Sequence, residues 1–336
     1  MEKIDRRNFI KNISVSSLPF FIPAIKPNDV LKFTLGFWHA EELQQLFGKL
    51  LLPNVSLNTI EREGKVGLFT NGVVVGSSIE ERGELAVAYL TKRPVLLPVP
   101  MTNSKREVDQ LEQVSTQEEH RIGVISHYSY LPSVKKAQEI LRKDLITNVK
   151  QIDLLVHSQV PDMMVSAGAD GVLGWYFHPF YLATLFLNSM PVGLEVRKAN
   201  GPQPFSNIYF DFENGVKVNL SVKDDLNKEH WVMTLRGGKS TLRLSGDHKI
   251  NFKNGQGQTN LFSFDSLDYK LALENMVLDY VKAVQEEKEP PVSLDVGKLS
   301  VTLQQAITIA AKEDSYVHLS EASTVDKAGI KLWEVQ

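Results

Sequence analysis

The sequence predicts an α/β protein with two domains, a parallel sheet with interleaved helices followed by a large, mainly antiparallel open sheet. Three observations predict this class. Short apolar runs alternate with helical patterns over residues 31–126, which is typical of βαβ units. Strand patterns with hairpin signals follow over residues 150–244, which indicates antiparallel pairing. The length of 336 residues exceeds one typical domain and allows two.

In the first half, the spacing of apolar residues predicts alternating strands and helices. The expected strands cover residues 31–36, 55–60, 66–75, 94–97 and 122–126. The expected helices cover residues 41–51, 79–90 and 104–119. Apolar residues recur every three or four positions in the first two helices, so each has one face to bury.

In the second half, helices flank a series of strands. A helix is expected from Pro132 to about Arg142, and two more near residues 271–286 and 296–313. Asn214-Gly215 lies between alternating runs and predicts a hairpin, because Asn-Gly accepts the positive φ of a tight turn. Gly237-Gly238 predicts a second hairpin in the same way.

The composition excludes several classes of function. The chain is 43% hydrophobic and 23% charged, as in ordinary globular proteins. It contains no cysteine, which removes disulfides, thiolate nucleophiles and iron–sulfur clusters. With 37 basic and 40 acidic residues the net charge is −3, so a nucleic-acid partner has no support. No uncharged apolar stretch reaches the length of a membrane span.

The N-terminus has the pattern of an export signal. Arg6 and Arg7 are followed by Phe9 and by an uncharged, mildly apolar run over residues 13–24. This order is typical of a twin-arginine signal. Two prolines interrupt the run, which disfavours the alternative of a basic amphipathic helix. We therefore expect residues 1–25 to be a signal peptide, cleaved near Ala24, and the protein to be periplasmic.

Several short stretches, in their order and spacing, resemble the Gfo/Idh/MocA oxidoreductase family from Leu31 to Leu319. They are LAVAYL with RPVLLPVPMT (residues 85–102), GVISHYSYLP (123–132), residues 171–182 around His178, FENG (212–215) and PPVSLDVGK (290–298). The resemblance implies a Rossmann-like domain over residues 31–128 and an α/β domain over residues 129–320, with a tail over residues 321–336. Residues 60–66 leave no room for a further βα crossover, so the Rossmann-like domain is expected to be truncated.

The family binds NAD(P) at a glycine-rich turn after the first strand. Here residues 35–40 read LGFWHA, so only Gly36 remains, and Phe37 and Trp38 are bulky. The acidic residue that would hold a ribose is also in doubt, although Glu61 or Glu63 could serve. We expect Gly36 to be the remnant of a cofactor site that no longer binds. NAD(P) would be the cofactor only if the family's function is retained.

The positions that carry catalysis in the family are also altered. Pro98-Val99-Pro100 stands where the family has Glu-Lys-Pro, and valine cannot transfer a proton. Of the second motif only His178 matches, because Gly174 and Tyr181 replace its two aspartates. His178 and Asp170 are the catalytic candidates. His178 is expected at the start of a helix with Pro179 in its first turn.

Aromatic residues near His178 could bind a sugar. We take His127, Tyr128, Trp175, Tyr176 and Tyr181 as candidate substrate-binding residues, since aromatic faces suit the apolar face of a pyranose. The alternative of ordinary core aromatics stays open at each of them.

Other chemistries have weaker signals. The eight histidines include no closely spaced ligand pair, so no metal site is expected, although His127, His157 and His178 could converge. Carboxylates for glycoside hydrolysis could come from Asp162, Asp170 or the Asp224-Asp225 pair.

Two functions follow as hypotheses. The first is an exported protein of carbohydrate metabolism that has lost the usual NAD(P)-dependent catalysis and acts by binding a carbohydrate or polyol, or by assembling with a partner. Its oligomer, with itself or a paralogue, would form through the open sheet. The alternative is an active NAD(P)-dependent sugar or polyol oxidoreductase, or a glycoside-processing enzyme with His178 as acid or base. A purely structural role is a third possibility.

Overall fold

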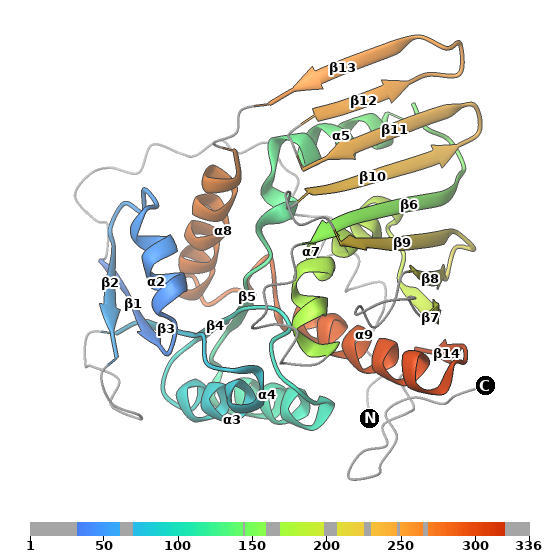
Figure 1. The fold of residues 1–336 in the computed structure, drawn as a ribbon. Coiled ribbons are helices and arrows are strands. Elements are labelled where there is room, and N and C mark those ends of the chain that lie inside the picture. Colours follow the sequence, from blue (N-terminus) through green and yellow to red (C-terminus); the bar gives the residue numbers. More distant parts are fainter. Residues whose placement is uncertain are drawn as a thin grey trace. The chain divides into compact units, whose positions relative to one another are not determined.

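The computed structural model describes residues 32–60, 70–143, 145–158, 169–197, 207–224, 230–246, 249–264 and 268–319 (Figure 1). Contacts divide the chain into two compact units. Unit 1 comprises Met1–Ser126 and Leu273–Val301, and unit 2 comprises His127–Ala272 and Thr302–Gln336. Unit 1 therefore includes a second, late segment that a linear division of the sequence does not assign to it. The domain boundaries expected from the sequence stay predictions.

Unit 1 contains the predicted parallel sheet, in the order β2-β1-β3-β4-β5. Its strands are β1 (Phe33–Trp38), β2 (Val55–Thr59), β3 (Gly72–Val75), β4 (Val95–Leu97) and β5 (Ile122–Val124). All residues of β1, β3, β4 and β5 are buried, as in parallel sheets that are covered on both faces. After β1 the chain first adds β2 on one side of β1, and it then crosses over to place β3 on the other side. The direction of winding therefore reverses between β1 and β3.

Several helices belong to unit 1, and α4 among them begins with a side-chain cap. They are α2 (Glu41–Gly48), α3 (Ile79–Leu90) and α4 (Lys105–Glu118), with most of α8 (Asp268–Gln285) and the first part of α9 (Leu294–Glu313). At the start of α4 the Ser104 hydroxyl accepts from the Glu107 N–H, and the Glu107 carboxylate accepts from the Ser104 N–H. This capping box satisfies two otherwise unpaired donors.

Strand β1 ends later than the sequence predicts. The expected strand stopped at Gly36, but β1 runs to Trp38, and Gly36 lies within it. A Cβ on Gly36 would come within 2.8 Å of the Ile60 side chain, so close packing is the reason for this glycine. The turn after β1 is His39-Ala40, where His39 has a positive φ of 44°. Gly36 is therefore not a turn residue, which corrects its expected position.

Unit 2 is built on a nine-stranded sheet in the order β13-β12-β11-β10-β6-β9-β8-β7-β14. Its strands are β6 (Val149–Ser158), β7 (Pro191–Arg197), β8 (Asn207–Phe212), β9 (Lys217–Asp224), β10 (His230–Gly237), β11 (Ser240–Ser245), β12 (Lys249–Lys253), β13 (Thr259–Ser263) and β14 (Val317–His318). Only β6 and β9 pair in parallel, and the other neighbours are antiparallel. The mainly antiparallel sheet expected from the sequence is confirmed. Both predicted hairpins are present, and Gly215 and Gly238 have the positive φ values of 78° and 53°.

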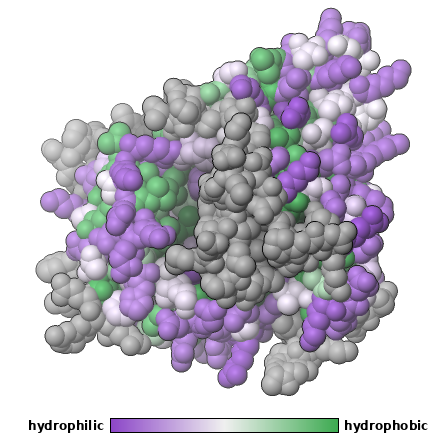
Figure 2. Space-filling view, in the orientation of Figure 1, coloured by the Kyte–Doolittle hydropathy of each residue, from purple (hydrophilic) through white to green (hydrophobic). Residues whose placement is uncertain are grey.

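The two faces of this sheet differ in polarity. Along β6, Ile152, Leu154 and Val156 are buried, and the alternate residues are partly exposed. Helices α5 (Pro132–Arg142) and α7 (Ala169–Leu187) contact the sheet and each other. The opposite face carries polar cross-strand pairs such as Arg236–Asp153 at 3.0 Å. Hydrophilic side chains prevail over strands β10 to β13, at the upper right of Figure 2.

Helix α7 differs from the expectation at its start. It begins at Ala169, so Pro179 lies inside the helix and not in its first turn. Proline removes one backbone N–H from the hydrogen-bond ladder, and the helix still continues to Leu187 because it is anchored by burial of Phe177, Phe180 and Leu182. Within the residues that the structure describes, no helix has the length and apolar character needed to cross a membrane.

Candidate functional site

Five aromatic side chains of unit 2 form the candidate site, which we call the His–Tyr–Trp cluster. Its members are His127, Tyr128, His178, Trp231 and Tyr269. They come from four separate elements: the short helix η1 (His127–Tyr130), α7, β10 and the first turn of α8. All five lie in the same compact unit.

Tyr128 is at the centre of the cluster. Its ring stacks on His178 with centroids 5.1 Å apart, and on Trp231 with centroids 5.8 Å apart. Tyr269 lies edge-on to Tyr128 at 5.5 Å and to His127 at 6.0 Å. The Trp231 Nε1–H donates to the Tyr269 hydroxyl at 3.0 Å, which fixes these two rings relative to each other. The cluster is therefore preorganised by contacts among its own members.

The two histidines of the cluster are neutral at neutral pH. Burial lowers the pKa of His127 to about 4. Burial and, to a smaller extent, the charge of His127 lower the pKa of His178 to about 3. The rings are 5.9 Å apart, so protonation of one opposes protonation of the other. As whole residues both histidines are partly exposed, whereas the Nδ1 atom of His127 is buried without a hydrogen-bond partner.

The structure unites three of the predicted site residues, His127, Tyr128 and His178. Tyr181 is only 2% exposed and stacks on Phe177 at 5.8 Å, and burial raises the pKa of its hydroxyl. Tyr181 is thus placed in the interior, one helical turn from His178. The side chains of Asp170, Trp175 and Tyr176 lie outside the described residues.

The expected absence of a metal site stays a prediction. Among the described residues, no three histidine or carboxylate side chains lie close enough together to hold a metal ion. Asp162 and Asp225 lie outside the described ranges, as do Glu61 and Glu63, and the side chain of Asp224 is not described.

Trp231 and Tyr269 were missed by the sequence analysis. The sequence predicts Trp231 only as a strand residue in a hairpin. Tyr269 lies at the start of a helix, and no recognisable motif surrounds it. Tyr128 and Tyr269 are more than one hundred residues apart in the sequence. Trp231 lies on β10 and Tyr269 on α8, and tertiary packing brings both rings to Tyr128 on η1.

The turn after β1 is where a dinucleotide phosphate would need glycines and free backbone N–H groups. Trp38 is 8% exposed and stacks on His39 at 4.5 Å. Ala40 packs against Gly76, since a Cβ on Gly76 would come within 2.6 Å of the Ala40 Cβ. Helix α2 carries Glu41 and Glu42 in its first turn, and two carboxylates there oppose a phosphate. These residues do not fit the pyrophosphate of NAD(P).

The chemistry open to the cluster follows from its residue types. Aromatic faces bind the C–H faces of sugars and cyclic polyols. A neutral imidazole offers one N–H donor and one acceptor nitrogen. Because their lowered pKa values keep His127 and His178 neutral at neutral pH, each has an unprotonated ring nitrogen that can accept a hydrogen bond or a proton. Neither carries an extra proton that it could donate as a general acid.

Neither protein-family models nor curated proteins give a match to the sequence. Solved structures do match, over most of the chain. The crystal structure of myo-inositol 2-dehydrogenase from Lactobacillus plantarum is 15% identical, with a TM-score of 0.71, and the match covers 87% of this chain and 100% of that one.

Two further solved structures contain ligands. An inositol dehydrogenase homolog from Azotobacter vinelandii, complexed with NADH and myo-inositol, is 12% identical with a TM-score of 0.70, covering 86% of this chain and 98% of that one. An oxidoreductase from Agrobacterium radiobacter, in complex with NAD+, L-tartaric acid and magnesium, is 11% identical with a TM-score of 0.70, and the coverage is again 86% and 98%. At these identities the likeness establishes the fold.

Proposed function

Because the chain has the fold of the Gfo/Idh/MocA oxidoreductases, we propose that it binds a small carbohydrate or polyol at the His–Tyr–Trp cluster without the NAD(P)-dependent catalysis usual in that family. Its role would be in carbohydrate metabolism. The observation that carries the proposal is the stacking of Tyr128 on both His178 and Trp231, with a second histidine, His127, in ring contact with His178.

The composition of the cluster supports a ligand with both C–H faces and hydroxyl groups. Ring faces contribute dispersion and hydrophobic contacts to the C–H face. The buried Nδ1 of His127 makes no hydrogen bond to the protein, and a buried polar atom left in that state costs free energy. A ligand hydroxyl at this atom would remove that cost. The Azotobacter vinelandii and Agrobacterium radiobacter proteins bind myo-inositol and L-tartaric acid, ligands rich in hydroxyl groups.

The loss of dinucleotide binding is supported by the turn after β1. It has no glycine, Trp38 and His39 stack there, and two glutamates occupy the first turn of α2. Val99 supplies no proton where the family has a lysine. Without a hydride acceptor, His178 would bind or orient the ligand by hydrogen bonds.

Export and assembly are further parts of the proposal. The Arg6-Arg7 pair and the apolar run after it support a twin-arginine signal and a periplasmic location. The polar face of the nine-stranded sheet supports assembly with a second copy or a paralogue, because its charged and amide side chains can form hydrogen bonds across an interface.

One observation favours the alternative of an active enzyme. A solved structure with the same fold contains NADH together with myo-inositol. In that case His178, neutral because burial lowers its pKa to about 3, would act as the base that accepts a hydroxyl proton. Glycoside processing would need a carboxylate partner for the same histidine, such as Asp170.

Calorimetry on the purified chain tests the proposal. Myo-inositol, L-tartrate, NAD+ and NADH are each titrated into the wild type and into the variants H127Q, H178Q and Y128A. H318Q is the matched control, since His318 is another unit 2 histidine that contacts a tyrosine ring, at 4.9 Å. We expect a polyol to bind the wild type and H318Q, and at least about tenfold weaker binding in the cluster variants, equivalent to about 1.4 kcal/mol.

The outcomes separate the hypotheses. Polyol binding without NAD(H) binding up to millimolar concentration supports the proposal. Micromolar NAD(H) binding with turnover supports the enzyme alternative. If no polyol binds, or if the cluster variants bind as the wild type does, the cluster is a packing feature and the proposal is wrong.

A further inference from the structure

Arg82 is a poorly compensated cation in unit 1. It lies on α3, and its guanidinium donates only to backbone carbonyls: Nε and Nη2 to Ser77 O, at 3.1 and 2.9 Å, and Nη1 to Pro100 O. No carboxylate among the described residues lies within ion-pair distance of it. Burial lowers the pKa of Arg82 to about 10, and the exposed Glu80 offsets this only in part.

The carboxylates near Arg82 in the chain, those of Glu80, Glu81 and Glu84, belong to exposed residues, and one that lies near it in space is engaged elsewhere. Glu107, whose side chain lies beside Gly83, uses its carboxylate in the capping box of α4. Glu80 is exposed and acts on Arg82 only as a nearby charge, outside ion-pair distance. Burying a charge is costly unless an opposite charge or sufficient hydrogen bonds compensate it. The part of the chain that the structure describes supplies carbonyl dipoles to Arg82 but no carboxylate.

Two further donors lie at the same edge of the sheet. Ser77 is 4% exposed, and its Oγ is buried without a hydrogen-bond partner. Trp38 is 8% exposed, and its Nε1–H is likewise buried without a hydrogen-bond partner. Trp38 ends β1 and Ser77 follows β3, and the Gly76 N–H donates to Trp38 O at 3.0 Å, so the two residues belong to adjoining strand ends. Donors left unpaired inside a protein are rare and call for an explanation.

We propose that Arg82 and Ser77, with Trp38 beside them, bind an oxyanion of a small molecule, a phosphate or carboxylate group, at the carboxyl end of β3. Arg82 as a residue is only partly buried, and the guanidinium N–H groups not used by the carbonyls can form charge-assisted hydrogen bonds to the anion. The Ser77 hydroxyl provides a further donor. The N-terminus of α3, where the Ser78 side chain makes no capping hydrogen bond, adds a favourable dipole.

The place in the fold agrees with this proposal. In open α/β sheets, ligands bind at the carboxyl ends of strands where the winding reverses, and in unit 1 the reversal falls between β1 and β3. The site differs from a dinucleotide site because it uses a side-chain cation and a hydroxyl after β3, and not a glycine turn after β1. It also lies in unit 1, so it does not depend on the His–Tyr–Trp cluster of unit 2.

Inorganic phosphate and acetate are the probes, with sodium chloride at matched ionic strength as the reference. Thermal unfolding and calorimetry are measured on the full chain and on the variants R82Q, R82K and S77A. R93Q is the matched control, because Arg93 is also half-buried and also donates to backbone carbonyls, those of Thr70 at 2.7 Å and Lys92 at 2.8 Å. A ligand that binds only the folded state raises Tm in a concentration-dependent way.

We expect phosphate or acetate to raise the Tm of the wild type and of R93Q more than chloride does. R82Q should lose the effect, and R82K and S77A should bind at least about tenfold more weakly, since charge-assisted hydrogen bonds are lost. Tighter binding of phosphate than of acetate would identify a phosphate group, and the reverse order a carboxylate.

Three results would overturn the proposal. The first is a wild-type Tm that responds to phosphate and acetate no more than to chloride. The second is S77A binding with wild-type affinity, which decides the matter even if R82Q does not fold. The third is R93Q losing as much affinity as R82Q, which would point to a nonspecific charge effect.

Discussion

At the scale of single residues, Gly123 shows how tightly unit 1 is packed. It is the middle residue of β5, and a Cβ there would lie 2.4 Å from the Tyr280 ring. Tyr280 is 2% exposed and cannot move into solvent without uncovering its ring. We expect G123A to lower the free energy of unfolding by about 1–3 kcal/mol through overpacking, as measured by urea denaturation.

Gly48 provides the matched control for this prediction. It is the last residue of α2, and a Cβ there would meet nothing within 4 Å. G48A should therefore be neutral or stabilising, by about 0.4–1 kcal/mol, because alanine restricts the unfolded chain. Equal effects of the two substitutions would contradict the packing argument.

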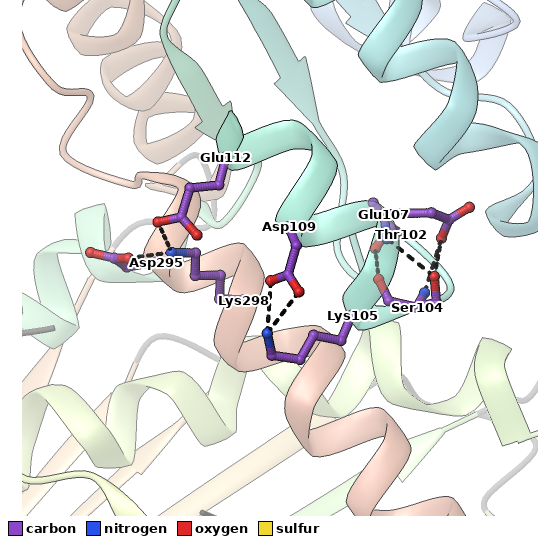
Figure 3. Close-up of polar contacts among 8 residues, drawn as sticks. All are labelled: Thr102, Ser104, Lys105, Glu107, Asp109, Glu112, Asp295 and Lys298. Atoms are coloured by element: carbon purple, nitrogen blue, oxygen red, sulfur yellow. Dashed lines mark hydrogen bonds and ion pairs between the residues drawn. The ribbon is translucent and has the colours of Figure 1, made fainter. Parts of the chain in front are cut away.

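At the scale of elements, Lys298 joins the start of α9 to α4 (Figure 3). Its ammonium group is 2.5 Å from the Glu112 carboxylate and 3.7 Å from that of Asp295, and the lysine side chain is only 18% exposed. Desolvation raises the pKa of Asp295, and the charge of Lys298 opposes that rise. The lysine therefore compensates carboxylates that belong to two helices.

We expect K298M to destabilise the protein by about 1–2 kcal/mol, because the desolvated Asp295 carboxylate and the half-exposed Glu112 carboxylate lose their shared cation. K105M is the control: Lys105 pairs with Asp109 at 2.7 Å within α4, on the surface, and such pairs contribute about 0.5 kcal/mol or less. Chemical denaturation of both variants measures the difference. A smaller loss in K298M than in K105M would show that the contact between α4 and α9 does not depend on this ion pair.

At the scale of the whole molecule, the two cluster histidines make stability depend on pH. Their folded pKa values, about 4 for His127 and about 3 for His178, lie below the ordinary value of 6.5. Between these folded values and 6.5 the unfolded chain binds more protons than the folded chain. The free energy of unfolding therefore has its full value above about pH 6.5 and decreases as the pH falls below that. At pH 5 the loss is up to about 2 kcal/mol for each histidine.

Unfolding free energies at pH 7 and pH 5 test this dependence. The wild type should lose more stability between the two pH values than H127Q or H178Q, since glutamine does not titrate. The comparison uses the change with pH within each variant, so an overall destabilisation by the substitution does not affect it. A variant with the same pH dependence as the wild type would show that its histidine titrates equally in the folded and unfolded chains.

Local patterns were sufficient for much of the fold. Helix α3 has the predicted bounds, Ile79–Leu90, and α5 runs from Pro132 to Arg142 as expected. The hairpin at Asn214-Gly215 follows from one dipeptide. Short-range spacing decides such elements, because the residues that form them are neighbours in the sequence.

The candidate site was predictable only in part. His127, Tyr128 and His178 could be named from motifs, but Gly36 could not be placed within β1, because the end of a buried strand depends on pairing with β2 and β3. Pro179 suggested a helix start, whereas packing of α7 tolerates it in the interior. In both cases tertiary contacts outweighed a local preference.

By itself, the sequence determined the class of the fold, the order of its elements and the exclusion of cysteine chemistry, since these depend on composition and on spacing along the chain. Only the tertiary structure decided that Trp231 and Tyr269 join Tyr128, and that the Arg82 guanidinium donates to Ser77 O and has no carboxylate partner among the described residues. The physical reason is that the burial of a side chain and the pairing of its charge depend on contacts between segments distant in the sequence. The topology of the chain determines which of these segments are in contact.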